Sequence, residues 1–455
     1  MLLSTTEKLF PLKTYSNEDY PSNGDGDEKI PIGQTWVGHL TTSAPVKEAR
    51  RASLKNAFMA SVLKNGGLDE KMVFFWHNHF GVNIDPIYES YICWEYHDLM
   101  RRYALGNFQD LVTHMTINPA MLIFLNGDGS KPENPNRNYA RELFERFTLG
   151  LGKYTEQDIA DAAVKLSGWE VNKARGFVNY TGAGNMNDFE TLISDLFRER
   201  GNDIAFFLAE KLMDYFIGYT DHPAEEIAKV ASALVGNKFD IKPALQAIFT
   251  SAYFSDPQFV GCQIKSPLEL IASVYRDFSV SLPWDKPVEL YRIMSQLRKK
   301  CAEMGLDLGE PPSVKGWDPF TQAPDFDKLW YTSDAAVIRA KFLDSLFDPW
   351  TFQLDPPYTF WIDVLEFTKG ITGAEDPNTL LATLVERMFP LPWTKDRLDK
   401  VKVDILLTGQ AEDRYWTNAW NRYLAYPYER NTAVVKERLT ALYKYLVSLE
   451  EYQLQ

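Results

Sequence analysis

Apolar residues recur every three to four positions along most of the chain from Val46 onward, the period of an amphipathic α-helix. The pattern predicts helices over 47–64, 69–81, 86–104, 107–116, 137–149, 156–167, 187–199, 203–217, 223–235, 241–253, 267–281, 286–304, 333–347, 377–389, 395–405 and 430–449. The start of the predicted helix over 267–281 is also marked by its sequence, because Ser266 and Glu269 fit a capping box and Pro267 occupies the first helical position. The predicted fold class is therefore mostly α: a large, compact multi-helix assembly with long irregular loops.

Strand signals are few. A weakly alternating stretch over 169–180 predicts at most one small β-hairpin. Residues 1–45 are largely polar and are predicted to form an irregular N-terminal segment, and residues 46–455 a single large α-helical domain, because no repeat or low-complexity linker marks a boundary. The part after about residue 346 is rich in tryptophans that we interpret as packing residues: Trp350, Trp361, Trp393, Trp416 and Trp420.

Charge narrows the range of partners. The chain has 48 Lys and Arg against 62 Asp and Glu, a formal net charge of -14. Nucleic-acid-binding proteins usually show a basic surplus or a basic stripe, and the nearest feature here is one helical turn, Arg298-Lys299-Lys300. No apolar run approaches the roughly 20 residues that span a bilayer. Neither a nucleic-acid partner nor a transmembrane segment is predicted.

Several common catalytic motifs are absent from the sequence. It contains no phosphate-binding loop, no dinucleotide-binding glycine motif, no nucleophile elbow and no His-Glu-x-x-His zinc helix. It also lacks the paired Glu-x-x-His elements of di-iron bundles and any Cys-x-x-Cys pair. Candidate chemistry therefore has to be sought in less standard arrangements.

The predicted helix over 69–81 is strongly apolar but contains His77 and His79, two of the six histidines in the chain. Positions i and i+2 of a regular helix lie about 200° apart, so these side chains are predicted to face opposite sides and not to share a metal. At most one of them is expected to face a site. The alternative is that each is a core histidine whose ring nitrogens bond to backbone or carboxylate groups.

The predicted helix over 137–149 carries a row of polar residues. At about 100° per residue, Asn138, Glu142 and Glu145 fall within about 60° of one another, and Arg141 lies at the edge of the same face. Two carboxylates one turn apart could hold a metal, act as acid and base, or pair with arginine. The row is therefore either a structural network or a functional site.

These helices belong to a series of short segments that occur in a fixed order. The segments are Phe75–Phe80, Tyr103–Phe108, Asn118–Leu122, Asn138–Leu143, Phe147–Gly150, Tyr154–Ile159, Ser167–Trp169, Lys265–Glu269 and Pro311–Trp317. In that order they resemble the bacterial family catalogued as domain of unknown function 1800, over about residues 68–342. Because the family is characterised mainly by sequence, the resemblance implies kinship and no particular activity.

Two departures from the family pattern stand out. Members usually carry a His-Asp-x-Gly-x-Lys-like stretch after the Gly-Trp, whereas Glu170–Asp188 contains no histidine. Arg146 stands where the family more often has an apolar residue or His. Many members look exported, so the resemblance implies a periplasmic or exported location, although the chain from Met1 shows no basic region followed by an apolar one.

The first functional hypothesis is an enzyme with a hydrolase-like or metal-binding site where the 69–81 and 137–149 helices meet. His79, Glu142 and Glu145 are its predicted catalytic residues, and the same three are its predicted ligands for a divalent metal, since one His and two carboxylates leave open coordination positions. The predicted substrate-binding residues supply a guanidinium, an amide and aromatic walls: Arg141, Asn138, Trp76, Tyr154 and Trp169.

The second hypothesis is a non-catalytic carbohydrate- or protein-binding or assembly protein of the bacterial cell surface or periplasm. An acidic chain with 14% aromatic residues would suit either kind of partner. The polar row would then be a buried network that fixes the fold. A wide aromatic groove without convergent titratable groups would favour this second hypothesis over the first.

Overall fold

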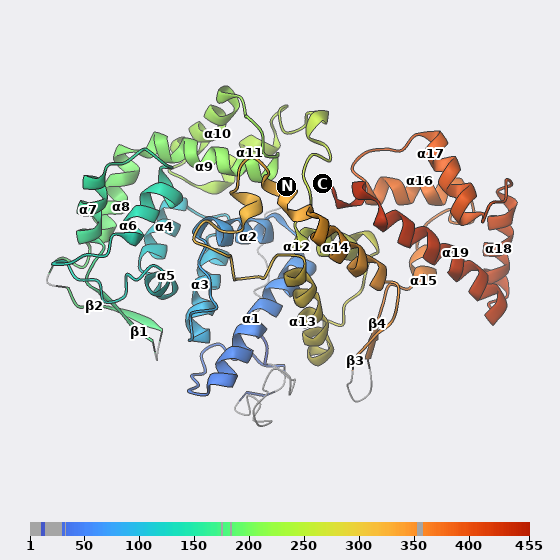
Figure 1. Ribbon diagram of the computed structural model, residues 1–455, viewed down its shortest axis with the longest axis horizontal. Coiled ribbons are helices and arrows are strands. Elements are labelled where there is room, and N and C mark those ends of the chain that lie inside the picture. Colours follow the sequence, from blue (N-terminus) through green and yellow to red (C-terminus); the bar gives the residue numbers. More distant parts are fainter. Residues whose placement is uncertain (1–10, 14–29, 32, 174–175, 183, 353–357) are drawn as a thin grey trace. The chain divides into compact units, whose positions relative to one another are not determined.

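The computed structural model describes residues 11–13, 30–31, 33–173, 176–182, 184–352 and 358–455 (Figure 1). Backbone contacts divide the chain into two compact units, each assembled from separate stretches of sequence. Unit 1 comprises Met1–Phe259, Asp285–Ala302 and Leu306–Phe326, and unit 2 comprises Val260–Trp284, Glu303–Gly305 and Asp327–Gln455. Most of the predicted N-terminal segment lies outside the described residues, and a single domain over 46–455 stays a prediction.

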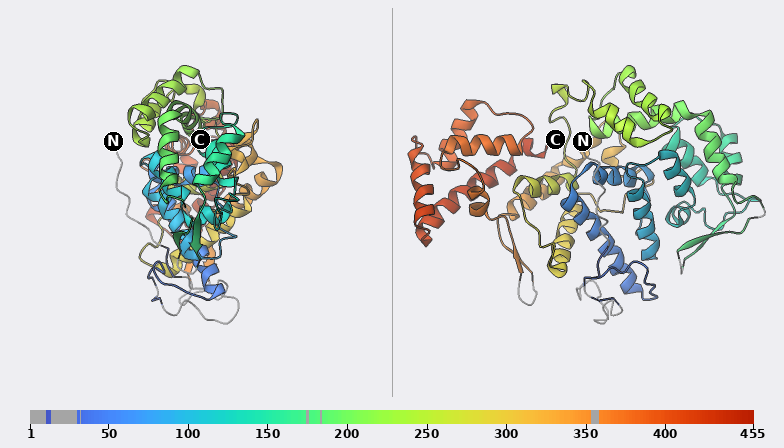
Figure 2. Two further views of the ribbon diagram at one scale, coloured as in Figure 1. Left: turned by 90° about the vertical axis from the view of Figure 1, so that its left-hand side faces the viewer. Right: turned by 180° about the vertical axis from the view of Figure 1, so that it is seen from behind.

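Unit 1 is built from helices and one hairpin. Its elements are α1 (Ala44–Asn65), α2 (Leu68–Phe80), α3 (Ser90–Arg102), α4 (Phe108–Thr116), α5 (Pro119–Phe124), α6 (Asn138–Glu142), η1 (Leu143–Thr148), α7 (Glu156–Lys165), β1 (Trp169–Asn172), β2 (Phe177–Tyr180), α8 (Asp188–Glu199), α9 (Gly201–Phe216), α10 (Ala224–Gly236), α11 (Ile241–Phe249), η2 (Pro257–Phe259), most of α13 (Pro287–Glu303) and η3 (Asp318–Phe320). Helices α9, α10 and α11 pack against one another (green in Figures 1 and 2).

Unit 2 is also mainly helical. Its elements are α12 (Pro267–Asp277), η4 (Phe326–Tyr331), α14 (Ser333–Ser345), β3 (Trp350–Phe352), β4 (Tyr358–Phe360), α15 (Val364–Lys369), α16 (Pro377–Met388), α17 (Lys395–Val401), η5 (Lys402–Leu406), α18 (Arg414–Ala425), α19 (Glu429–Ser448) and η6 (Glu450–Gln453). The long helix α19 packs against α14, α15 and α18, and its buried face presents Val435, Leu439, Leu442 and Leu446 at helical spacing.

The mostly α fold class predicted from the sequence is confirmed. Each of the sixteen predicted ranges contains a helix, and the 169–180 hairpin forms as antiparallel β1 and β2, in which Trp169 pairs with Tyr180. Three α-helices, the short 3-10 helices and a second hairpin were not predicted; the α-helices are α5, α15 and α18, and the hairpin is β3–β4. None of the described helices combines the length and the apolar character that crossing a membrane requires.

The helix predicted over 137–149 differs from the expected regular helix. After the five residues of α6 the chain widens into the π-helix η1, in which the N–H of Leu149 bonds to the carbonyl of Phe144 at 2.8 Å. A π-helix bonds residue i to residue i+5, so side chains after Leu143 no longer follow the angular spacing of an α-helix. Such segments are uncommon and frequently occur at functional sites.

Two segments far apart in the sequence meet closely at the C-terminal end of α2. Asn78 Oδ1 accepts the backbone N–H of Trp317 at 2.9 Å. Gly81 and Gly316 both have positive φ, and a Cβ at Gly81 would lie 2.7 Å from the carbonyl carbon of Val314. The Phe75–Phe80 segment and the Pro311–Trp317 segment are thus held together by backbone approaches that only glycine permits.

Replacing Gly316 by alanine is expected to destabilise unit 1. The added Cβ would overlap Asn78 Oδ1 and lie 2.6 Å from the Asn78 carbonyl oxygen, at a φ of +93°. Gly305 is the matched control, because it has a similar φ of +99° but no atom within 4 Å of the added Cβ. Urea unfolding should show G316A less stable than G305A by about 2 kcal/mol or more. If the two variants lose the same free energy of unfolding, the close approach of Gly316 to Asn78 does not contribute to stability.

In unit 2 the chain's last residues pair with a segment near the start of the unit. The N–H of Lys265 bonds to the carbonyl of Gln453 at 2.7 Å, and the N–H of Gln455 bonds to the carbonyl of Gln263 at 2.9 Å. Arg339, which is fully buried, reaches both strands of this pairing. Its Nε donates to Gln453 Oε1 at 2.8 Å, and its Nη2 donates to the Lys265 carbonyl at 2.7 Å.

Candidate functional site

The π-helix η1 packs against both α2 and α9. The polar side chains of His79, Lys211 and Arg146 lie at this junction. Carbonyl groups in the last turn of a helix have no partner within the helix. Here two of them accept from side chains of the neighbouring helices, Phe147 from His79 on α2 and Arg146 from Lys211 on α9. The π-helix thereby links α2 to α9 through hydrogen bonds to its own backbone.

His79 is buried and neutral. Its Nε2 lies 3.1 Å from the Phe147 carbonyl, so Nε2 carries the proton, and Nδ1 lies 3.4 Å from Lys211 Nζ as an acceptor. Burial, followed by the charge of Lys211, lowers the pKa of His79 well below its ordinary value of 6.5. The rings of Phe75, Trp76 and Phe108 surround it. Both ring nitrogens are occupied, so His79 is suited to position Lys211.

Lys211 is the group with the most unusual environment in this junction. Its Nζ lies 3.4 Å from His79 Nδ1 and 3.4 Å from the Arg146 carbonyl, and it sits 4.8 Å from the ring centroid of Phe207. Burial and the nearby Arg146 guanidinium lower the pKa of Lys211 from 10.5 to about 8, against the opposing charge of Asp214. An amine of this pKa has a substantial neutral fraction near physiological pH.

The two glutamates of the predicted polar row share one arginine. Arg146 Nε lies 3.0 Å from Glu142 Oε2, and its Nη2 lies 3.4 Å from Glu145 Oε1. The Tyr154 hydroxyl donates to Glu145 Oε2 in a short hydrogen bond. Burial raises the pKa of Glu142, although the adjacent Arg146 works against the rise. Glu142 therefore gives up its proton less readily than an ordinary glutamate.

Of the other predicted substrate-binding residues, Arg141 interacts with Tyr154, and Trp76 packs on the ring of His79. Asn138 is exposed, and Arg141 forms a bidentate pair with exposed Glu156 at 2.9 Å. Trp76 is completely buried, where it stacks on Phe108 and donates to the Ala104 carbonyl. Trp169 is buried against Tyr180 and Phe189. Asn138 is the first residue of α6, where it is exposed, and both tryptophans occupy core positions.

Tyr154, the fifth predicted residue, connects the cluster with a cavity of about 260 Å³. Its ring stacks on Phe144 of η1 while its hydroxyl bonds to Glu145. Polar residues from α7 and α8 and the chain that follows α8 line the rest of the cavity, namely Asp158, Asp161, Lys165, Asp195, Glu199 and Arg200. A polar molecule in this cavity would therefore lie beside Tyr154, whose hydroxyl bonds to Glu145.

The divalent metal predicted from the sequence gains no support from the geometry. Within the part of the chain that the structure describes, no three His, Cys, Asp or Glu side chains are grouped so that they could hold a metal ion. Arg146 and Tyr154 occupy the carboxylates of Glu142 and Glu145, and Phe147 and Lys211 occupy His79. His79, Glu142 and Glu145 as metal ligands therefore stay a prediction.

Sequence reasoning missed the contribution of α9. One turn beyond Lys211, Asp214 Oδ1 lies 3.2 Å from Nε2 of buried His222, whose Nδ1 lies 3.0 Å from the Tyr253 hydroxyl. Burial is the main cause that raises the pKa of Asp214. A signal was present for Lys211 alone, because on a regular helix Lys211 lies about 60° from Leu208, at the edge of the apolar stripe, whereas Asp214 lies nearly opposite that stripe.

His77 faces away from this junction, as the two-residue spacing predicted. Its Nε2 lies 2.9 Å from His97 Nδ1, and His97 Nε2 lies 3.4 Å from Arg101, which pairs with buried Glu70. Phe58 packs against both histidine rings. The alternative of a core histidine therefore describes His77, while His79 faces the candidate site.

Comparison with known proteins gives one match. The family described as Protein of unknown function (DUF1800) matches residues 8–454, essentially the whole chain. No curated protein and no solved structure matches it. The match extends well beyond the 68–342 segment that carries the recognisable motifs, so it includes residues of both units.

Proposed function

Since the chain belongs to the DUF1800 family of unknown function, we propose its function from the site itself: a hydrolase-type acid–base site at the junction of α2, η1 and α9. The observation that carries the proposal is Lys211, half-buried between His79 and the Arg146 carbonyl, with a pKa of about 8. With that pKa roughly a quarter of the amines are neutral at pH 7.5, against about one in a thousand for an ordinary lysine.

The proposed roles use the lowered pKa of Lys211 and the raised pKa of Glu142. The neutral Lys211 amine takes a proton from a water molecule as the water oxygen bonds to the acyl carbon of an ester. The bond from that carbon to the leaving oxygen breaks, and protonated Glu142 donates its proton to the leaving oxygen. The charged Lys211 then returns its proton to Glu142 through solvent, so one water and one ester give one acid and one alcohol. His79 acts as a positioning residue for Lys211.

The partial exposure of the cluster supports this proposal. The side chains of Glu142, Glu145 and Arg146 are 18%, 19% and 28% exposed, so solvent and a small substrate can reach them. A lysine placed beside a guanidinium costs stability, and such costs are typical of residues retained for function. A network that only fixed the fold would be better served by an apolar residue at position 211.

The first test is the reactivity of Lys211. Trace acetylation of the intact protein with acetic anhydride from about pH 6 to about pH 11, read by peptide mass spectrometry, should give Lys211 an apparent pKa of about 8. Hydrolysis of p-nitrophenyl acetate should rise with the same pKa and fall about 100-fold in K211M. Methionine keeps the length of the side chain, and circular dichroism would check that the variant folds.

Lys153 provides the matched control, because it is exposed and lies near the same junction. K153M should hydrolyse the ester at the wild-type rate, and E142Q should lose the alkaline side of the pH profile, where a general acid gives up its proton. If Lys211 titrates like an ordinary lysine, or if K211M hydrolyses the ester as fast as wild type, the junction is a structural network and the non-catalytic hypothesis takes its place.

A further inference from the structure

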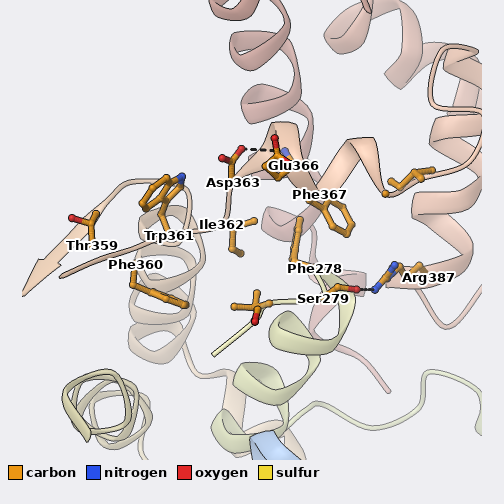
Figure 3. A pocket seen from close by; sticks show the side chains of 14 residues that line it. Phe278, Ser279, Thr359, Phe360, Trp361, Ile362, Asp363, Glu366, Phe367 and Arg387 are labelled. Carbon is orange, nitrogen blue, oxygen red and sulfur yellow. Dashed lines mark hydrogen bonds between the residues drawn. The ribbon is translucent and has the colours of Figure 1, made fainter. Parts of the chain in front are cut away.

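We propose that unit 2 carries a second, independent binding site, a pocket for a neutral saccharide of one or two rings. The pocket has a volume of about 530 Å³ and lies between the end of α12, strand β4, α15 and α16 (Figure 3). This size is within the range of small-molecule sites in proteins. The proposal depends on no residue of the acid–base site in unit 1.

An exposed tryptophan forms one side of the pocket. Trp361 is 38% exposed, whereas Trp416 and Trp420 in the same unit are buried. The prediction that the C-terminal tryptophans are packing residues is therefore wrong for Trp361. In Figure 3, Trp361 and Arg387 lie on opposite sides of Ile362 and Phe278. A flat aromatic face next to an apolar floor matches the C–H face of a sugar ring.

A hydrogen-bond acceptor is held in place near Trp361. Asp363 caps α15, where its Oδ1 accepts the N–H groups of Leu365 and Glu366 at 3.0 Å and 3.2 Å. Among the described residues its Oδ2 has no recorded partner. The cap orients the carboxylate in advance, so Oδ2 is available to accept from a hydroxyl group of a ligand.

A hydrogen-bond donor, Arg387, is held in place at the side of the pocket away from Trp361. Arg387 Nη2 donates to the Arg276 carbonyl at 2.9 Å and to Ser279 Oγ at 2.5 Å, and its guanidinium lies 5.4 Å from the ring centroid of Phe367. These contacts fix the guanidinium plane, and no described residue is recorded as a partner of Nε or Nη1. Three N–H donors, one on Nε and two on Nη1, therefore remain for a ligand.

The charges of the pocket select the class of ligand. Carboxylates of Asp363 and Glu366 line one part of it and the guanidinium of Arg387 another, so an ion of either sign meets both attraction and repulsion. A neutral ring whose hydroxyl groups each donate and accept can use both ends and stack on the aromatic face between them. An amino-acid zwitterion is the competing class, with its carboxylate on Arg387 and its ammonium on Asp363.

Saturation-transfer NMR on the full chain tests the proposal with cellobiose, maltose and N,N′-diacetylchitobiose as neutral probes and phenylalanine as the zwitterion. At least one disaccharide should receive saturation on its ring protons, and W361A should weaken its binding about fivefold to tenfold. D363N should also weaken binding while it keeps the helix cap, because asparagine caps as well as aspartate. Y415A is the matched control, since Tyr415 is 40% exposed in the same unit and lies outside the pocket lining.

Three outcomes would overturn the proposal. The first is that none of the disaccharides receives saturation. The second is that W361A binds as tightly as wild type or Y415A loses binding equally. The third is that phenylalanine binds through Trp361 and the disaccharides do not.

Discussion

Acidification from about pH 7 to about pH 5 is expected to destabilise unit 1 steeply, because His77, His79 and His97 are buried in it as neutral rings. Burial lowers the pKa of all three, and that of His77 falls from 6.5 to about 3. Below about pH 6.5 the unfolded chain takes up protons that the folded chain excludes. The contribution of the three neutral histidines to the free energy of unfolding is therefore complete above that pH and is lost as the pH falls. At pH 5 the loss for His77 is about 2 kcal/mol.

The hydrogen bonds of the His77–His97 pair explain why protonation is so unfavourable. Arg101 donates to His97 Nε2, so His97 carries its proton on Nδ1 and donates it to His77 Nε2. A second proton on either ring would leave two N–H groups facing each other or a ring facing the Arg101 guanidinium. Protonation of His77 would therefore break the hydrogen bond of the pair, and protonation of His97 would place a second positive charge beside Arg101.

Urea unfolding followed between about pH 7 and about pH 5 measures this effect. H77Q should reduce the slope of unfolding free energy against pH by up to about 1.4 kcal/mol per pH unit. H114Q is the matched control, because it removes an exposed histidine from the same unit. A wild-type stability that stays constant to pH 5, or a slope that H77Q leaves intact, would contradict neutral burial of these rings.

Loss of Arg339 is expected to be the most damaging single substitution in unit 2. R339M would leave Gln453, the Lys265 carbonyl and the Trp330 carbonyl without their buried donor. Several buried acceptors without a donor should cost about 3–5 kcal/mol. R339K should recover little of this, because one ammonium cannot replace the planar fork of a guanidinium that reaches three separate acceptors.

Lys341 supplies the control, since it lies on the same helix two residues later and is exposed. K341M should change the free energy of unfolding by no more than about 0.5 kcal/mol. Urea unfolding of the three variants beside wild type gives the comparison. A loss below about 1 kcal/mol in R339M, or full recovery in R339K, would show that Arg339 does not hold the segment around Gln453 in place.

Helices with a clear apolar stripe could be predicted from the sequence, and those that were missed have physical reasons. The helix α5 is only six residues long and apolar all round, so it has no period to detect. Strands β3 and β4 have three residues each, too few for a visible alternation. The case of α18 is different, because Trp416, Trp420 and Tyr423 are buried at helical spacing and their periodicity could have been recognised.

The candidate site was predictable only in part. The sequence predicts that His77 and His79 face opposite sides of α2, and only His79 contacts the 137–149 segment, through the Phe147 carbonyl. Glu142 and Glu145 both pair with Arg146. The π-helix could not be foreseen, since Leu143–Thr148 has the apolar spacing of an ordinary helix. Lys211 lies far away in sequence and enters through the tertiary packing of α9. Periodicity predicts which face of a helix is buried but not which distant helix packs against it.

The pairing of residues 263–265 with 453–455 has a consequence for the order of events during synthesis. Lys265 Nζ bonds to the Tyr452 carbonyl, 187 residues further along the chain. Unit 2 therefore cannot close when its first helix, α12, leaves the ribosome; it has to wait until residues 453–455 have emerged. Unit 1 likewise waits for 285–302 and 306–326. From the emergence of residues 260–284 until residues 453–455 follow, the early part of unit 2 is an apolar segment without its partners, which a chaperone would need to cover.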